Sequence, residues 1–173
     1  MRLGLAISLI LLLPASALAV GQGEAELSGG FGLAVALQGQ ARAGAQAEVR
    51  LLRGLSDSWA ARLGLQTAWY PADGATPSAH VTAQAFGLTW AADVLSLVPF
   101  ADLGIIVADI RGSGVAARQS LGGQLGVGAD YLISRHFTMS LLARVDYFAL
   151  RLAGGHDPRP TQLTLALDLG RTF

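Results

Sequence analysis

Residues 161–173 of the chain read TQLTLALDLGRTF. Leucine occupies every second position from Leu163 to Leu169, and the positions between hold threonine, alanine and aspartate. Successive side chains of an extended strand point to opposite faces, so the leucines share one face and the polar or small residues share the other. This alternation predicts a β-strand with one apolar face and one polar face.

The same alternation recurs along the chain and predicts an all-β fold of eight strands. These strands cover residues 25–38, 42–51, 59–70, 80–91, 100–108, 120–132, 137–150 and 161–173. Most of them reach the length of about 9–11 residues with which a tilted strand crosses a membrane. In residues 80–91 the apolar positions change parity, from Val81 and Ala83 to Phe86. We therefore expect a β-bulge near residues 85–87.

The connections between these strands alternate in length. Short connections are predicted at residues 53–58, 92–99 and 133–136, and longer ones, rich in Gly, Pro and Asp, at 71–79, 109–119 and 151–160. The first connection, at residues 39–40, is short although it lies on the side of the longer ones. Short turns on one side and longer loops on the other are typical of outer-membrane barrels.

Composition narrows the class of protein. The chain of 173 residues is long enough for one domain, and it is 52% hydrophobic but only 14% charged. After the first 20 residues, no apolar run approaches the length of about 20 residues that a membrane helix needs. Twelve basic residues balance twelve acidic ones, so no basic field favours nucleic acid as a partner. The chain has no cysteine, which excludes disulfides and thiolate metal sites.

The first residues have the pattern of a secretory signal. Arg2 supplies the positive charge, residues 3–13 are apolar, and Ala17-Leu18-Ala19 forms an A-x-A cleavage site. We therefore predict a signal peptide at residues 1–19 and a barrel domain at residues 20–173.

The polar face of the strands carries charges of both signs, separated by glycine and alanine. These charges are Glu26, Arg42, Glu48, Arg50, Arg62, Asp130, Arg144, Asp146 and Asp168. Such a face suits a narrow lumen, where small residues leave room and opposite charges pair. A soluble barrel of the lipocalin kind would carry its charges outside and its apolar side chains inside. We expect the apolar face to point outward, into lipid, and the charges to form a network in the lumen.

Aromatic residues gather near both ends of the predicted strands, as expected of the two interfacial girdles of a membrane barrel. Near the short connections these are Trp59, Trp90, Phe100, Tyr131, Phe137 and Phe173, and near the longer ones Trp69, Tyr70, Tyr147 and Phe148.

On these features the chain resembles the small eight-stranded outer-membrane proteins, the OmpA/OmpX-like barrel family. The resemblance covers residues 24–173 and rests on the strand pattern, on the segment 88–104 and on the terminal Phe173. It implies an eight-stranded antiparallel up-and-down transmembrane barrel in a bacterial outer membrane. It also implies that the barrel-assembly machinery recognises the last strand, with Phe173 as the assembly signal. Arg171 departs from the family pattern, which has a hydrophobic residue two places before the end.

The function predicted from these features is a structural or surface-interaction role without enzymatic activity, cofactor or metal. The expected partners are outer-membrane lipid, lipopolysaccharide and the assembly machinery, and no surface partner can be named. One alternative is a narrow pore, because rings of charge tune ion selectivity. Another is a lipid-modifying enzyme, whose candidate catalytic groups are His136 with Thr138 and the pair His156-Asp157, but no residue is predicted to be catalytic.

Overall fold

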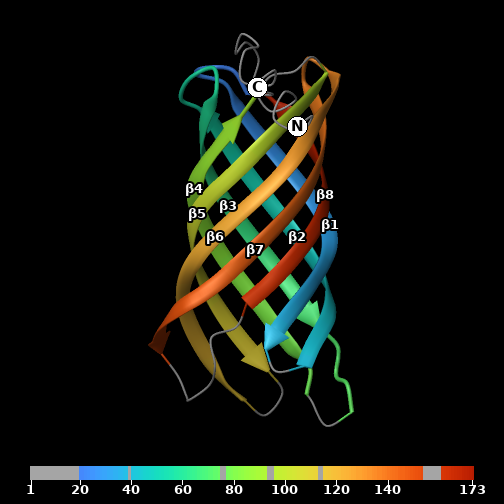
Figure 1. Cartoon of the computed structure of the whole chain (residues 1–173), viewed down its shortest axis with the longest axis vertical. Helices are drawn as coiled ribbons and strands as arrows, with labels where there is room; N and C mark the ends of the chain where they lie inside the picture. The colour runs from blue at the N-terminus through green and yellow to red at the C-terminus, as the bar shows by residue number, and fades with distance from the viewer. Residues whose placement is uncertain (1–19, 39, 75–76, 93–95, 113–114, 154–160) are drawn as a thin grey trace, which may run out of the picture.

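The computed structural model describes residues 20–38, 40–74, 77–92, 96–112, 115–153 and 161–173. They form a closed antiparallel barrel in which each strand pairs with the next and β1 pairs with β8 (Figure 1). The strands are β1 (Ala25–Gln38), β2 (Gln40–Gly54), β3 (Trp59–Tyr70), β4 (Ala79–Ala91), β5 (Leu97–Gly112), β6 (Val115–Ser134), β7 (Phe137–Ala153) and β8 (Thr161–Thr172). The predicted fold class is confirmed. No helix among these residues is long and apolar enough to span a membrane.

The apolar face of the strands points outward, as predicted. In β8 the alternation is complete: Leu167 is 53% exposed, whereas its neighbour Asp168 is 1% exposed. On each strand, large apolar side chains of the outward set lie on the surface, among them Leu33, Val49, Leu65, Leu88, Leu103, Leu125, Leu141 and Leu165. The exterior is therefore apolar around the middle of the barrel, and the polar side chains at this level lie within it.

Small residues let β1 close the barrel against β8. The Cα of Gly32 pairs with Ala166, and a Cβ on this glycine would overlap the backbone carbonyl of Leu165. Glycine without a side chain permits this close approach of two backbones.

The barrel has two distinct ends. β1 begins and β8 ends beside the short connections, and we name this the turn end (Figure 1). The opposite end, where β3 leads to β4 through residues 71–78, is named the loop end. The predicted long connection at residues 109–119 is wrong, because β5 continues to Gly112 and β6 begins at Val115. Gly and Arg in this stretch suggest a loop, but backbone pairs from Asp109 with Gln119 to Gly112 with Val115 extend the sheet.

The predicted bulge in β4 is also wrong. β4 pairs without a register shift with both β3 and β5, and the shifts occur instead along β5–β6 and β6–β7. The parity of β4 therefore stays constant: Val81 and Ala83 point inward with Ala85, and His80, Thr82 and Gln84 point outward. The apolar pattern of β4 changes face because the lumen itself is apolar at the loop end.

Candidate functional site

The predicted lumen charges lie where the sequence placed them, with one exception. Glu26, Glu48, Arg50, Arg62, Asp130, Arg144, Asp146 and Asp168 are all buried. Arg42 is half-buried at the loop end, where its guanidinium donates to the carbonyl oxygens of Pro71 (2.6 Å) and Pro77 (3.0 Å). The prediction that Arg42 belongs to the lumen charge network is wrong, because it binds the β3–β4 connection to β2 instead.

Arg144 of β7 reaches across the lumen to two strands. Its Nη1 donates to Oε2 of Glu48 on β2 at 2.7 Å, and its Nη2 donates to Oε1 of Gln66 on β3. Gln66 in turn donates to Asp146 at 3.0 Å, and Gln124 of β6 donates to the other oxygen of Asp146 at 2.8 Å. A single guanidinium and its amide neighbours thus link four strands across the lumen.

Arg50 anchors a second part of the network. Its Nη2 lies 2.6 Å from Oδ2 of Asp168, and its Nε lies 3.4 Å from Oε1 of Glu48. Asp102 lies 4.0 Å from Arg50 and 3.8 Å from Arg62, and accepts a hydrogen bond of 2.6 Å from Thr89. Asp102 was missed from the sequence, although its place between Ala101 and Leu103 is the same signal that identified the other lumen carboxylates.

Apolar clusters bound this network towards both ends of the lumen. The cluster at the loop end, here called the loop-end cluster, consists of Ala34, Ala68, Tyr70, Val81, Ala83, Ala85, Ile106, Ala108 and Phe148. Towards the turn end lie two smaller clusters, one of Ala91, Val98, Phe100 and Leu142 and one of Val20, Leu52 and Ala60. The lumen is therefore apolar towards the loop end, whereas towards the turn end the apolar clusters lie beside buried polar side chains such as Glu26 and Thr138.

Three aromatic residues belong to these clusters rather than to the predicted girdles. Tyr70, Phe148 and Phe100 are at most 5% exposed and point inward, and the Tyr70 hydroxyl donates to Gln162 at 2.9 Å. Alternation could have shown this for Tyr70 and Phe148, since each follows directly after an outward aromatic residue. The other predicted girdle residues, Trp59, Trp69, Trp90, Tyr131, Phe137, Tyr147 and Phe173, are exposed on the outer surface.

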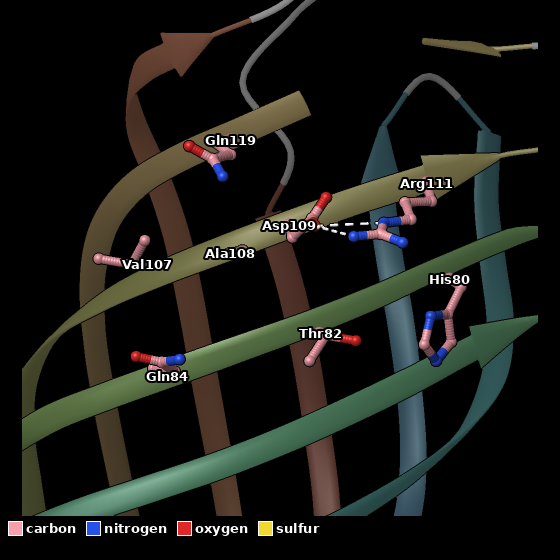
Figure 2. A pocket seen from close by; sticks show the side chains of 8 residues that line it. All are labelled: His80, Thr82, Gln84, Val107, Ala108, Asp109, Arg111 and Gln119. Carbon is pink, nitrogen blue, oxygen red and sulfur yellow. Dashed lines mark hydrogen bonds and ion pairs between the residues drawn. The ribbon is translucent and has the colours of Figure 1, made fainter. Parts of the chain in front are cut away.

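A polar pocket of about 430 Å³ lies on the outer wall at the loop end, as Figure 2 shows. It is lined by His80, Thr82, Gln84, Val107, Ala108, Asp109, Arg111 and Gln119. Arg111 donates to Oδ2 of Asp109 through Nη2 (2.7 Å) and Nε (3.2 Å). Nε2 of His80 lies 2.7 Å from the hydroxyl of Thr67 on β3. The sequence did not predict this pocket, because the expected bulge placed Thr82 and Gln84 on the inner face.

Of the candidate catalytic residues, the structure describes His136 and Thr138, and these two side chains do not lie together. His136 is exposed in the turn between β6 and β7, whereas Thr138 is buried and donates to Oε2 of Glu26 at 3.2 Å. His156 and Asp157 lie outside the described residues. In the described part of the chain, no three His, Cys, Asp or Glu side chains are grouped as metal ligands would be.

The end of β8 is fixed at the turn end. The backbone N–H of Phe173 donates to Ala25 (2.8 Å), and the guanidinium of Arg171 stacks on the rings of Phe173 (5.2 Å) and Phe137 (5.8 Å). Arg171, which departs from the family pattern, therefore lies among outward aromatic side chains. The role of Phe173 as assembly signal stays a prediction.

Outer-membrane barrels are among the solved structures that are similar to this chain. Neisserial surface protein A is similar with a TM-score of 0.76 and 9% identity, over 88% of this chain and 100% of that one. The N-terminal β-barrel domain of Pseudomonas aeruginosa OprF is similar with a TM-score of 0.62 and 16% identity, over 88% and 99%. The outer membrane enzyme PagL is similar with a TM-score of 0.51 and 17% identity, over 84% and 97%. No protein-family model and no curated protein matches the chain. The chain thus has the fold of the small eight-stranded outer-membrane β-barrels.

Proposed function

We propose that the chain is an outer-membrane barrel with a sealed lumen, which acts through its outer surface in a structural or surface-interaction role. The observation that carries this proposal is the lumen: a hydrogen-bonded polar network crosses it, an apolar cluster lies at its loop end, and smaller apolar clusters lie towards its turn end. Transport needs a continuous water path, and the side chains of Tyr70, Ile106 and Phe148 fill the loop end.

The exterior supports a location in a lipid bilayer. Contiguous apolar patches larger than a few hundred Å² are rare on soluble monomers, whereas this barrel exposes apolar side chains around its whole circumference. The closed sheet also pairs every strand, as a membrane interior without water requires. A signal peptide at residues 1–19 would export the chain, and Phe173 would present it to the assembly machinery.

A narrow pore is the alternative that the lumen charges favour. Among the described residues, six carboxyl groups but only three guanidinium groups are buried. The carboxyl groups are those of Glu26, Glu48, Asp102, Asp130, Asp146 and Asp168, and the guanidinium groups those of Arg50, Arg62 and Arg144. Any current through such a lumen would be carried mainly by cations.

A role without catalysis is supported by the placement of Thr138, one of the groups considered for catalysis. The Thr138 hydroxyl is turned into the lumen and bound to Glu26, out of reach of lipid. The similarity to PagL concerns the fold, and a fold supports many unrelated functions.

The test begins with the full chain expressed in a Gram-negative host. We expect the protein in the outer-membrane fraction, beginning at Val20 by mass spectrometry, and shifted in gel mobility by heating. Recovery as a soluble periplasmic protein with one heat-independent band would overturn the membrane assignment.

Planar-bilayer recording then separates the sealed barrel from the pore. We expect no single-channel conductance from the wild type, and we expect discrete cation-selective events after Tyr70→Ala with Phe148→Ala. Trp69→Ala is the matched control, because Trp69 adjoins Tyr70 but points outward. Steady conductance of the wild type would establish the pore instead.

A further inference from the structure

The outer wall of the barrel is apolar around its middle and becomes polar at the loop end of β4 and β5. On β4, the outward side chains change from Phe86, Leu88 and Trp90 to Gln84, Thr82 and His80 towards the loop end. On β5 they change from Leu103, Ile105 and Val107 to Asp109 and Arg111. We name His80, Thr82, Gln84, Asp109 and Arg111 the polar notch.

The polar notch begins where the apolar surface ends. Phe86 pairs with Leu63 and Ile105, all three exposed, so this level of the wall suits hydrocarbon. One step further, Gln84 pairs with Leu65 and Val107.

Still further towards the loop end, His80 pairs with the outward Trp69 on one side and with Arg111 on the other. Tryptophan and tyrosine gather at the level of lipid head groups in membrane proteins. The notch therefore lies at head-group depth, open towards the surrounding lipid.

The geometry of the notch suits an anionic group that also carries hydroxyls. Asp109 holds the guanidinium of Arg111 through Nε and one N–H of Nη2, which leaves three N–H donors unused by this pair. Thr82, Gln84 and Gln119 add hydroxyl and amide groups that can donate and accept hydrogen bonds. A guanidinium held in one orientation is well suited to a phosphate.

We propose that the polar notch binds the phosphorylated sugar head group of a glycolipid in the outer leaflet, with Arg111 on the phosphate and Gln84 and Thr82 on sugar hydroxyls. This inference rests on the proposed outer-membrane location, since only there does the notch face such lipid. The pocket of about 430 Å³ accepts part of a head group, while the acyl chains lie along Phe86 and Ile105.

The experiment uses the mature protein refolded in uncharged detergent, with binding of purified lipopolysaccharide measured by tryptophan fluorescence. Phosphatase-treated lipopolysaccharide and phosphatidylglycerol are the comparison lipids. The test variant is Asp109→Asn with Arg111→Gln, which removes both charges of the ion pair together, so that neither charge is left unpaired. Arg53→Gln is the matched control, because Arg53 is exposed on the outer wall at the turn end.

We expect the test variant to bind intact lipopolysaccharide about tenfold more weakly than the wild type or Arg53→Gln, the loss expected for a hydrogen bond to a charged group. Removing the phosphates should weaken wild-type binding by a similar factor. The double variant Thr82→Val with Gln84→Leu should also weaken binding, because it removes the groups proposed to bind sugar hydroxyls. Its apolar side chains are compatible with an outer wall that faces lipid.

The inference is overturned if the test variant binds like the wild type, or if either comparison lipid binds as well as intact lipopolysaccharide. Heat-shifted mobility of every variant shows that the barrel is folded, so a failed binding site is distinguished from a failed barrel.

Discussion

Replacement of Arg144 by methionine is the sharpest test of the lumen network. Nη1 of Arg144 lies 2.7 Å from Glu48, and both side chains are at most 2% exposed. Methionine fills a similar space but leaves Glu48 with Arg50 as its remaining cation, at 3.4 Å, and it also removes the cation that lies 3.5 Å from Asp146. Six buried carboxyl groups would then face two guanidinium groups instead of three. Removal of one partner of a buried ion pair typically costs about 3–5 kcal/mol, and we expect a loss in this range.

A second substitution identifies the cause of that loss. In Arg144→Met with Glu48→Gln, one of the two carboxylates that lose Arg144 is gone, and five buried carboxyl groups face two guanidinium groups. We expect the double variant to regain at least about 1 kcal/mol, because the desolvated unpaired charge is the costly element.

The free energy of unfolding would be measured by urea titration in lipid vesicles, followed by tryptophan fluorescence. Arg53→Met is the control, because Arg53 is exposed, and we expect it to match the wild type closely. A loss below about 1 kcal/mol for Arg144→Met would refute the reasoning, since water in the lumen would then be solvating Glu48. A double variant less stable than the single one would refute it equally.

Further substitutions test the wall, the closure and the last strand. Leu165→Arg should cost about 2–4 kcal/mol in vesicle unfolding, because it places a charge on the lipid face; an unchanged midpoint would contradict the face assignment. Gly32→Val should lower the yield of heat-shifted barrel, because a Cβ there overlaps the carbonyl of Leu165, whereas Gly29→Val on the same strand, where a Cβ comes no closer than 3.6 Å to a neighbouring atom, should be tolerated better. Deletion of Phe173 should reduce the amount of protein in the outer membrane while refolding in detergent is preserved, and equal loss of both would point to stability rather than recognition.

Strand positions and face assignments followed largely from local alternation. The bounds of β1 and β3 were predicted to the residue, because their patterns run from one turn to the next without interruption. The inward orientation of Val81 and Ala83 was not predicted, since it depends on the loop-end cluster that other strands contribute. The extension of β5 and β6 was missed for a similar reason. Backbone pairing extends these strands beyond the apolar part of the wall. There the sequence holds polar residues and glycine and lacks the alternation of apolar side chains that predicts a membrane strand.

The partners within the lumen lie beyond what alternation can show. Period two assigns Arg144 and Glu48 to the inner face, but it does not say that they meet, because they are 96 residues apart in sequence. Their contact depends on the closure of the sheet and on the register of β7 against strands far from it in the chain. The same limit explains Arg42, whose inner-face position was predicted but whose partners, Pro71 and Pro77, belong to a connection.

The distribution of polarity along the barrel axis indicates where interactions with other molecules take place. In the middle of the barrel the polar groups are inside and the apolar groups outside, as a lipid environment requires. At the loop end of β4 and β5 this order is reversed: Val81, Ala83 and Ile110 point towards the lumen, and His80, Thr82 and Arg111 point outward. A pore would need the opposite arrangement, with polar groups lining its mouth. The reversal therefore places apolar side chains in the lumen and polar side chains on the outer wall of the same two strands. For this reason we expect the barrel to bind other molecules at its outer surface rather than to conduct them through its lumen.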